Sequence, residues 1–420
     1  FMKKISKLRG MQDIEPLQAK KYDFIEMEFN SISKSYGYDE VRFPILENTE
    51  LFERSVGDES DIVNKEMFTF ESKSGKSMTM RPEGTAGSMR MAIENGLLDS
   101  GQQRISYKGP MFRYERPQKG RSRQFQQLSL EAYGFDDYSI DLEILEICKE
   151  FFTKLSLGEK IFLEINSIGT QKDQKIYSTK LKDYFSNFKK DLDEDSLKRL
   201  EKNPLRILDS KNEKLFNLIE GAPKIYDSIS TKSQENYSKI KDFLKKLQIK
   251  YIENPLLVRG LDYYNDLVFE WKSNELGSQD TVCGGGRYDS LSKIIGGRET
   301  SAIGFSIGLD RLSLLVEDSL IPKQKSLMII SLEDSYFLDA LKLATSLRNK
   351  LDNFSVQFLG KEKNLKSLLK KANKKNTDFM VIIGKKEIDS NSYTLKNLPK
   401  NLELQVNGFE ALINNLNENF

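Results

Sequence analysis

The sequence predicts an α+β protein of more than one domain. Segments of strand character occur in pairs separated by polar turns before residue 170, as in antiparallel hairpins. Residues 171–247 nearly lack glycine and have apolar residues at helical spacing, and strands and helices alternate after Pro322. A chain of 420 residues is also longer than one hydrophobic core usually organises, so two or three domains are expected.

The first third of the chain is expected to hold one helix followed by strands. An amphipathic helix is predicted over residues 16–36, with Phe24, Met27 and Ile32 near one stripe and Gly37 at its end. The strands expected after it are 41–45, which contains Pro44, a hairpin over 67–81 that turns at 74–76, the pair 104–113 and 125–135 joined by the polar loop 115–124, and 161–165.

The rest of the chain is expected to hold a helical insertion, a return of strands and a small α/β domain. After the helical residues 171–250, strands are predicted at 257–258, 267–271 and 281–283, the last followed by Gly284–Gly286, and a strand runs into a helix over 303–312. Beyond Pro322 the expected order is strand 327–331, helix 335–351, strand 356–359, helix 362–374 and strand 379–383, which indicates a partly parallel sheet.

Composition excludes several kinds of chemistry. The chain has no histidine, so neither a histidine base nor a Cys/His zinc site is possible. Its two cysteines, Cys148 and Cys283, are too few for a disulfide framework and fit a reducing compartment. No apolar run is long enough to span a bilayer, and none follows the basic start, so no membrane association and a cytoplasmic location are expected.

Charge is distributed unevenly along the chain. Residues 171–250 hold 19 Lys and Arg against 13 Asp and Glu, and residues 326–420 hold 14 against 11, whereas the remainder is acidic. Two basic regions on either side of an acidic body suit a polyanion gripped by the outer parts. A lysine-rich composition that only decorates solvated faces explains the same numbers, and charge alone leaves both interpretations open.

The segment 109–131 carries the strongest chemical signal. Five basic residues occur from Arg113 to Arg123, bracketed by the carboxylates Glu115 and Glu131 and followed by Phe125. Converging arginine forks suit a triphosphate, and a phenylalanine ring offers a flat face to adenine. The alternative is a solvated basic hairpin loop.

Four further segments add polar groups, each with a plainer alternative. Glu83 and Thr85 lie on a tight turn where they can hold an ammonium group, or Thr85 can simply cap a helix. Arg259 precedes a glycine and two tyrosines, and a buried arginine requires an anion. Gly284–Gly286 before Arg287 indicates a close approach of the backbone, and Arg311 opens a helix where it can also be an ordinary surface residue. Neither G-x-x-x-x-G-K-[ST] nor a G-x-G-x-x-G after a strand is present, so bound ATP would be held by arginines on a sheet.

Taken together, these segments resemble the class II aminoacyl-tRNA synthetases, and specifically the histidyl-tRNA synthetase family. Residues 41–47 with Pro44 resemble the first motif of the class, 109–131 the second and 303–312 the third, and 259–265 and 285–289 resemble the two histidine-specific signatures. The resemblance implies an antiparallel sheet flanked by helices. It divides the chain into a catalytic domain at 1–170 and 251–325, a helical insertion at 171–250 and an anticodon-binding α/β domain at 326–420.

The resemblance also implies roles for individual residues. Arg113 and Arg259 would be catalytic and flank the attacking carboxylate and the α-phosphate. The family pattern assigns L-histidine to Glu83, Thr85, Arg113, Gln127, Glu131, Arg259, Tyr263 and Tyr264, with Glu131 and Tyr264 on the two imidazole nitrogens. It assigns ATP to Arg113, Glu115, Arg121, Phe125 and Arg311.

The implied reaction is the ATP-dependent activation of L-histidine to histidyl-adenylate, followed by transfer to the 3′ end of tRNA(His). ATP, Mg²⁺, tRNA(His) and a homodimer partner are implied, and the resemblance gives no Mg²⁺ ligands. Two rivals are a non-catalytic paralogue that regulates ATP phosphoribosyltransferase in histidine biosynthesis and an RNA-binding module without catalysis; intact polar residues at the site positions disfavour both. Tyr114, Gln126 and Ser129 depart from the family pattern at positions with no implied ligand contact.

Overall fold

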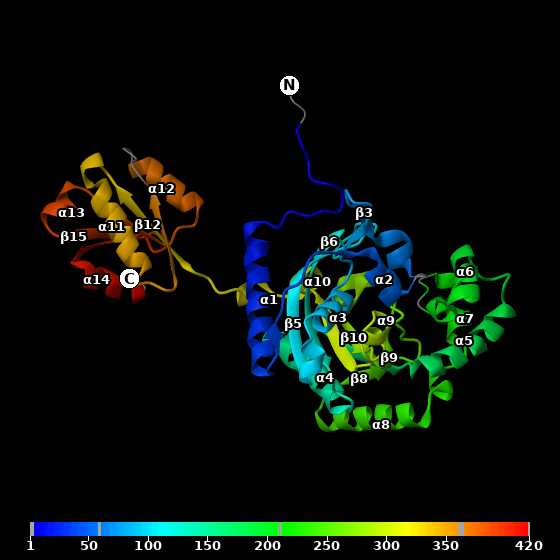
Figure 1. The fold of residues 1–420 in the computed structure, drawn as a ribbon. Helices are drawn as coiled ribbons and strands as arrows, with labels where there is room; N and C mark the ends of the chain where they lie inside the picture. The colour runs from blue at the N-terminus through cyan, green and yellow to red at the C-terminus, as the bar shows by residue number, and fades with distance from the viewer. Residues whose placement is uncertain (1–3, 58–59, 209, 211, 360–364, 419–420) are drawn as a thin grey trace. The chain divides into compact units, whose positions relative to one another are not determined.

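The structure is a computed structural model that describes residues 4–57, 60–208, 210, 212–359 and 365–418. It divides into two compact units, Phe1–Ile321 and Pro322–Phe420 (Figure 1). Within the described residues, no helix has the length and apolar character that crossing a membrane requires.

An eight-stranded sheet forms the centre of the first unit. Its six inner strands are antiparallel, and short parallel strands close both edges. The mainly antiparallel sheet confirms the α+β prediction. In spatial order the strands are β1 (Asp39–Glu40), β5 (Gln103–Phe112), β6 (Gln124–Tyr133), β11 (Ala302–Gly308), β10 (Thr281–Arg287), β9 (Asn265–Lys272), β7 (Phe162–Ser167) and β8 (Tyr251–Glu253).

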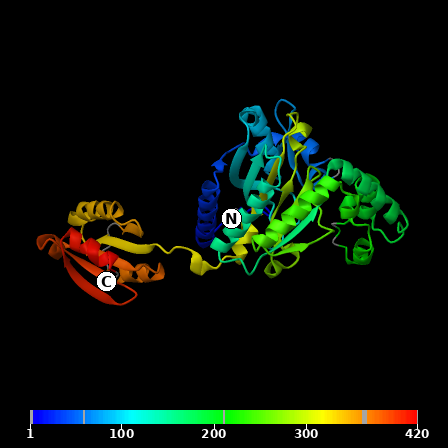
Figure 2. The ribbon, with the colours of Figure 1, turned by 90° about the horizontal axis from the view of Figure 1, so that it is seen from below.

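Helices α1 (Pro16–Ser35), α4 (Ser139–Lys154) and α8 (Thr231–Lys246) cover one face of this sheet (Figures 1 and 2). Helix α1 begins with Pro16 in its first turn, where the missing N–H costs nothing, and ends before Gly37, whose φ is 75°. Its buried stripe is Tyr22, Ile25, Phe29 and Ile32. The expectation that Met27 belongs to the buried stripe was wrong, because that side chain is exposed.

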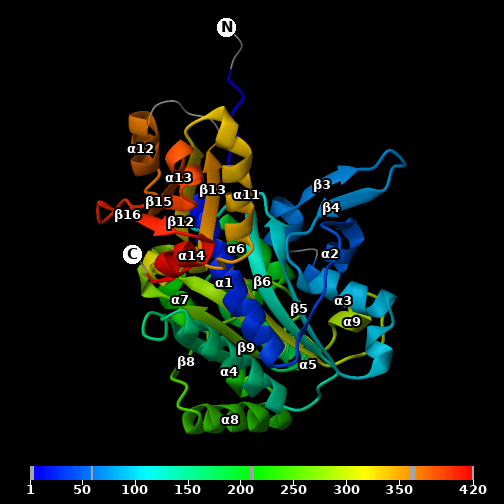
Figure 3. The same ribbon diagram turned by 90° about the vertical axis from the view of Figure 1, so that its left-hand side faces the viewer.

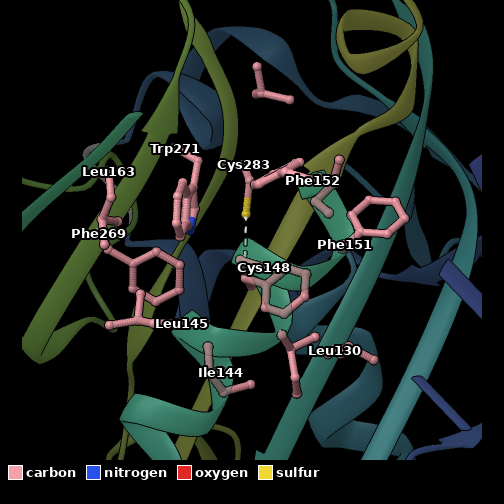
Figure 4. Close-up of a cluster of buried hydrophobic side chains, with 14 of the residues drawn as sticks. Leu130, Ile144, Leu145, Cys148, Phe151, Phe152, Leu163, Phe269, Trp271 and Cys283 are labelled. Carbon is pink, nitrogen blue, oxygen red and sulfur yellow. Dashed lines mark hydrogen bonds between the residues drawn. The ribbon is translucent and has the colours of Figure 1, made fainter. Parts of the chain in front are cut away.

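Helix α4 was not anticipated from the sequence, although Ile140, Ile144, Ile147 and Phe151 recur at helical spacing. It contributes Cys148 to the core beneath the sheet, where Sγ lies 4.0 Å from Sγ of Cys283 on β10 (Figure 4). Both thiols are free and buried.

A smaller sheet extends from this body. Strands β2 (Leu46–Asn48), β4 (Ser77–Met80) and β3 (Phe68–Glu71) are antiparallel, and the β3–β4 hairpin projects outward (Figure 3). The predicted hairpin over 67–81 is therefore confirmed. Helices α2 (Thr49–Val56), α3 (Thr85–Glu94), α9 (Leu291–Ile294) and α10 (Leu309–Leu315) complete the body.

Two predicted strands are wrong. Residues 41–45 are the connection between the two sheets: the Val41 amide bonds to Ser106 of the large sheet, whereas the Ile45 carbonyl bonds to Arg81 beside the small one. Pro44 has no amide hydrogen to extend either ladder. Residues 257–258 are also outside any strand, because the adjacent edge is filled by β8.

The stretch between β7 and β8 is helical, as predicted. It contains α5 (Gln171–Ser186), α6 (Glu194–Lys202), α7 (Phe216–Glu220) and α8, and α5 begins with a capping box of Thr170 and Asp173. Its apolar residues, including Tyr177, Leu181 and Phe185, belong to the same buried cluster as Tyr263 and Tyr264 of the body. Treating residues 171–250 as a separate domain remains a prediction.

The second unit is a five-stranded sheet with helices. Its order is β13 (Phe354–Leu359), β12 (Lys325–Ser331), β14 (Phe379–Ile383), β15 (Ser392–Asn397) and β16 (Leu402–Asn407), with the first three parallel and the last two antiparallel. The partly parallel sheet is confirmed, while β15 and β16 were not anticipated. The helices are α11 (Phe337–Arg348), α12 (Leu365–Lys374), α13 (Lys385–Asp389) and α14 (Phe409–Asn417); residues 362–364 of the predicted helix lie outside the described residues.

Candidate active site

The site lies on the face of the large sheet opposite α1 and α4. Along β6, Leu128 and Leu130 join the core under those helices, so by the two-residue period of a strand Gln127 is on the other face. Every residue assigned to ligands from the sequence lines one cavity there, except Glu131. The cavity wall includes Glu83, Thr85, Arg113, Glu115, Arg121, Phe125, Gln127, Arg259, Tyr263, Tyr264 and Arg311.

The β5–β6 connection supplies the basic end of the cavity. Arg113 donates through Nε to the Pro82 carbonyl at 2.8 Å, and its guanidinium carbon lies 5.3 Å from the centre of the Phe125 ring. Glu115 forms an ion pair with Arg121 and lies 3.9 Å from Arg113. The Glu115 carboxylate therefore lies between two arginines of the cavity wall.

Arg311 reaches the same place from the first turn of α10. It donates to the carbonyls of Gly120 and Thr281, each at 2.9 Å, which ties the connection to the sheet. Burial lowers the pKa of Arg311, and the positive charges of Arg121 and Arg113 lower it further. Burial likewise lowers the pKa of Arg113 and Arg121. Such a desolvated group of like charges is stabilised by an anion.

Arg259 faces this group from the segment before β9. It forms an ion pair with Glu270 and lies with its guanidinium carbon 5.5 Å from the centre of the Tyr264 ring. Burial acts to lower the pKa of Arg259, but Glu270, Tyr264 and Tyr263 together outweigh burial and raise it. A Cβ on Gly284 would lie 2.5 Å from Nη2 of Arg259, so the expected close approach at the glycine run is an approach of this guanidinium.

Glu83 lies at the start of α3 and both of its carboxylate oxygens are engaged. They accept the amides of Thr85 at 2.6 Å and Ala86 at 2.9 Å, which satisfies two donors of the helix terminus. The alternative in which Thr85 caps the helix does not hold, because the Thr85 hydroxyl donates to Glu131 at 2.9 Å instead.

Glu131 lies behind the cavity wall. Besides Thr85, its carboxylate accepts the hydroxyl of Tyr107 at 2.8 Å and that of Tyr288. Burial raises the pKa of Glu131 to about 8, against the opposing effect of these three donors. A Cβ on Gly304 would lie 1.7 Å from Oε2, so a glycine on the neighbouring strand leaves space for this carboxylate.

Tyr107 and Tyr288 were missed by the sequence reasoning. The Tyr288 ring centre lies 5.5 Å from that of Tyr263 and 6.2 Å from that of Tyr264, at interplanar angles of 62° and 89°. The three tyrosines therefore form one aromatic group beside Glu131. Tyr288 could have been found from the sequence, because only Arg287 separates it from Gly284–Gly286. Tyr107 on β5 carried no local signal.

Gln127 has a free acceptor on the cavity wall. Among the described residues, its Oε1 is buried and has no hydrogen-bond partner. A buried unsatisfied carbonyl oxygen costs about 1–3 kcal/mol, which a donor such as an ammonium group would recover.

Arg287 belongs to the same histidine-specific signature, residues 285–289, as Tyr288, but its contacts are structural. It donates to both carboxylate oxygens of Asp141 and to the carbonyls of Phe135 and Asp137. Asp141 is fully buried, and burial raises its pKa to about 6 although Arg287 acts to lower it.

The described residues contain no group of three or more Asp, Glu or Cys placed to hold a metal ion. Glu115 is the carboxylate nearest the arginines and is shared between two of them. Mg²⁺ that accompanies ATP needs only one or two protein carboxylates, since phosphates and water fill the other positions. Within the described part of the chain, the cavity wall therefore offers Glu115 as a shared carboxylate and has no preformed metal cage.

An antiparallel sheet with arginines converging on one face is the architecture of a class II aminoacyl-tRNA synthetase. A family model described as histidyl-tRNA synthetase matches residues 10–312, and one described as anticodon binding domain matches residues 326–419. The histidine–tRNA ligase of Francisella philomiragia is 46% identical over 98% of both chains, and that of Francisella tularensis subsp. novicida is 45% identical over 98% of this chain and 99% of its own.

Solved structures agree in fold. The apo histidyl-tRNA synthetase of S. aureus superposes with a TM-score of 0.80 at 32% identity, covering 98% of this chain and 99% of that one. A Bacillus halodurans protein described as an ATP phosphoribosyltransferase regulatory subunit/histidyl-tRNA synthetase gives 0.65 at 20% identity, covering 90% and 97%, and shows the fold alone. The chain belongs to the histidyl-tRNA synthetase family.

Proposed function

We propose that the cavity of this histidine–tRNA ligase binds L-histidine and ATP side by side through the residues assigned above. The observation that carries the proposal is that Arg113, Arg121, Arg259 and Arg311 line one cavity. Four arginines converging on a buried space match the charge of a triphosphate and of a carboxylate. Phe125, beneath Arg113, offers the flat surface for adenine.

The amino-acid end of the cavity supports the histidine assignment. Gln127 Oε1 and the Glu83 carboxylate are acceptors for the α-ammonium group, with Thr85 between them and Glu131. Tyr264 on the cavity wall and Glu131 directly behind that wall are the polar groups that we assign to the two imidazole nitrogens. A pocket that pairs both nitrogens penalises side chains that lack them, because its own buried groups would then be unpaired.

The reaction needs no protein base. The histidine carboxylate attacks the α-phosphorus of ATP, the bond to the β-phosphate oxygen breaks, and histidyl-adenylate and pyrophosphate result. Arg113 and Arg259 balance the negative charge that grows on the phosphate oxygens during this step. The ribose hydroxyl at the 3′ end of tRNA(His) then attacks the acyl carbon and AMP leaves; a phosphate oxygen takes the hydroxyl proton, which suits a chain without histidine.

Mg²⁺ is part of the proposal as a companion of ATP. When bound, it neutralises charge on the phosphates. We propose Glu115 as the carboxylate that would meet it, because Glu115 lies between Arg113 and Arg121.

The proposal extends to the surroundings of the enzyme. Two free thiols 4.0 Å apart fit a reducing compartment and hence a cytoplasmic location. Ile45 and Leu46, beside Pro44, are 39% and 44% exposed, and an apolar surface there suits a homodimer contact. The second unit, with its anticodon-binding match, is the part expected to meet the anticodon of tRNA(His).

Histidine-dependent exchange of labelled pyrophosphate into ATP tests the function. We expect exchange with the parent chain and its collapse in Arg259→Ala, with histidine binding partly retained. An unchanged rate in Arg259→Ala removes that residue from the mechanism. If the parent chain gives no exchange, the proposal is contradicted and the non-catalytic regulatory alternative is favoured. The high identity to histidine–tRNA ligases argues against that alternative.

A further inference from the structure

The segment that carries Arg259, Tyr263 and Tyr264 lies outside the sheet. It occupies residues 259–264, after the turn that follows β8 and before β9 begins at Asn265. A segment without ladder hydrogen bonds takes its position from its other backbone and side-chain contacts. In this structure, much of that support comes from the helical insertion.

Asp262 is the main point of contact between residues 259–264 and the helical insertion. Arg206, which follows α6 in the insertion, donates to its carboxylate at 2.6 Å, and Asn203 donates to the same oxygen at 3.2 Å. The body holds Asp262 from the other side, because the Asp262 amide donates to the Val56 carbonyl at 3.3 Å. A Cβ on Gly57 would lie 2.0 Å from Oδ2 of Asp262, so the carboxylate fills a space that only glycine leaves open.

The insertion contacts the segment at two more places. Arg206 also lies 3.5 Å from the carbonyl of Gly260, the residue after Arg259. Gln174 of α5 donates to the carbonyl of Tyr264 at 2.9 Å. The insertion therefore meets the segment just after Arg259 and again at its last tyrosine.

We propose that Arg206, through Asp262, is a positioning residue for Arg259, so that adenylate formation depends on the seating of the insertion. The inference rests on the role proposed above for Arg259. The Arg206 side chain is only 12% exposed, so its ion pair is partly withheld from solvent and holds geometry better than a surface pair. A shift of the segment would move the guanidinium away from the reacting phosphate while leaving Arg113, on a different element, in place.

The test compares kcat and KM in histidine-dependent pyrophosphate exchange. We expect Arg206→Met and Asp262→Asn each to lower kcat roughly tenfold, since misplacement by a fraction of an ångström is costly in such a step. The double variant is expected to be no slower than the slower single variant, because both changes break one contact. Arg206→Lys should restore part of kcat.

Glu253→Gln is the matched control. It removes the 2.9 Å ion pair between Lys241 of the insertion and Glu253 of the body, a link between the same two parts that involves neither Arg206 nor residues 259–264. Its kcat should equal that of the parent chain, and circular dichroism should show all variants folded at the assay temperature.

The outcomes separate the two proposals. An inactive parent chain refutes the proposed function. An active parent with unchanged kcat in Arg206→Met overturns the positioning role alone. A double variant whose kcat falls by the product of the two single losses also overturns it, and so does an equal loss of kcat in Glu253→Gln. Either result means that the insertion stabilises the body without positioning Arg259.

Discussion

Gly284→Ala should displace Arg259 without unfolding the protein. The added Cβ would lie 2.5, 2.7 and 2.8 Å from Nη2, Nη1 and Cζ of Arg259, whereas ordinary contact begins near 3.4 Å. The guanidinium must therefore move by about 1 Å, and a misplacement of this size costs on the order of a hundredfold in rate. The backbone can stay, because the three nearest atoms all belong to a flexible side chain.

The assay is kcat for histidine-dependent pyrophosphate exchange, with the unfolding midpoint measured in parallel. We expect kcat to fall about a hundredfold, with the midpoint close to that of the parent chain. Gly158→Ala is the control, since a Cβ there meets nothing nearer than 3.8 Å. A Gly284→Ala variant with parental kcat would refute the placement of Arg259 at the reacting phosphate.

Three other outcomes follow from the structure. Arg287→Met leaves Asp141 buried without its partner and should destabilise the protein by about 3–5 kcal/mol, which lowers Tm by roughly 10 °C. Arg42→Met, which removes an exposed ion pair, should leave Tm unchanged. Equal Tm values for the two variants would contradict the buried pair of Arg287 and Asp141. Glu131 has a raised pKa, so the stability that its protonated form contributes is fully present below about pH 4.5 and is lost as the pH rises to about 8. The Tm of Glu131→Gln minus that of the parent chain should therefore increase from pH 5 to pH 8. A difference in Tm that stays constant over this range would exclude the raised pKa. Phe125→Leu should raise KM for ATP roughly tenfold through lost stacking and leave KM for histidine unchanged; a parallel rise in both would remove Phe125 from the adenine site.

Much of the site was predictable because its residues lie close together in sequence. Arg113, Glu115 and Phe125 belong to one hairpin, and the pairing of two adjacent strands brings them together without help from the rest of the fold. The helical stretch and the partly parallel C-terminal sheet were predictable for the same reason, since hydrophobic period and chain order determine them locally.

What the sequence did not predict depends on contacts between distant elements. Residues 41–45 have strand composition, but each end pairs with a different sheet, so no ladder continues through them. Tyr107 reaches Glu131 only because β5 and β6 are in one register, and no local pattern marks it. The bond from Arg206 to Asp262 joins residues 56 positions apart, through an insertion whose packing on the body has no signature in composition.

A crystal structure of the chain with a sulfamoyl analogue of histidyl-adenylate tests the central assignment most directly. We expect the sulfamoyl group within hydrogen-bond distance of Arg113 and Arg259, the amino group on Oε1 of Gln127 and the adenine against Phe125. An analogue bound elsewhere, or bound in the cavity with both arginines turned away from the sulfamoyl group, would contradict the account.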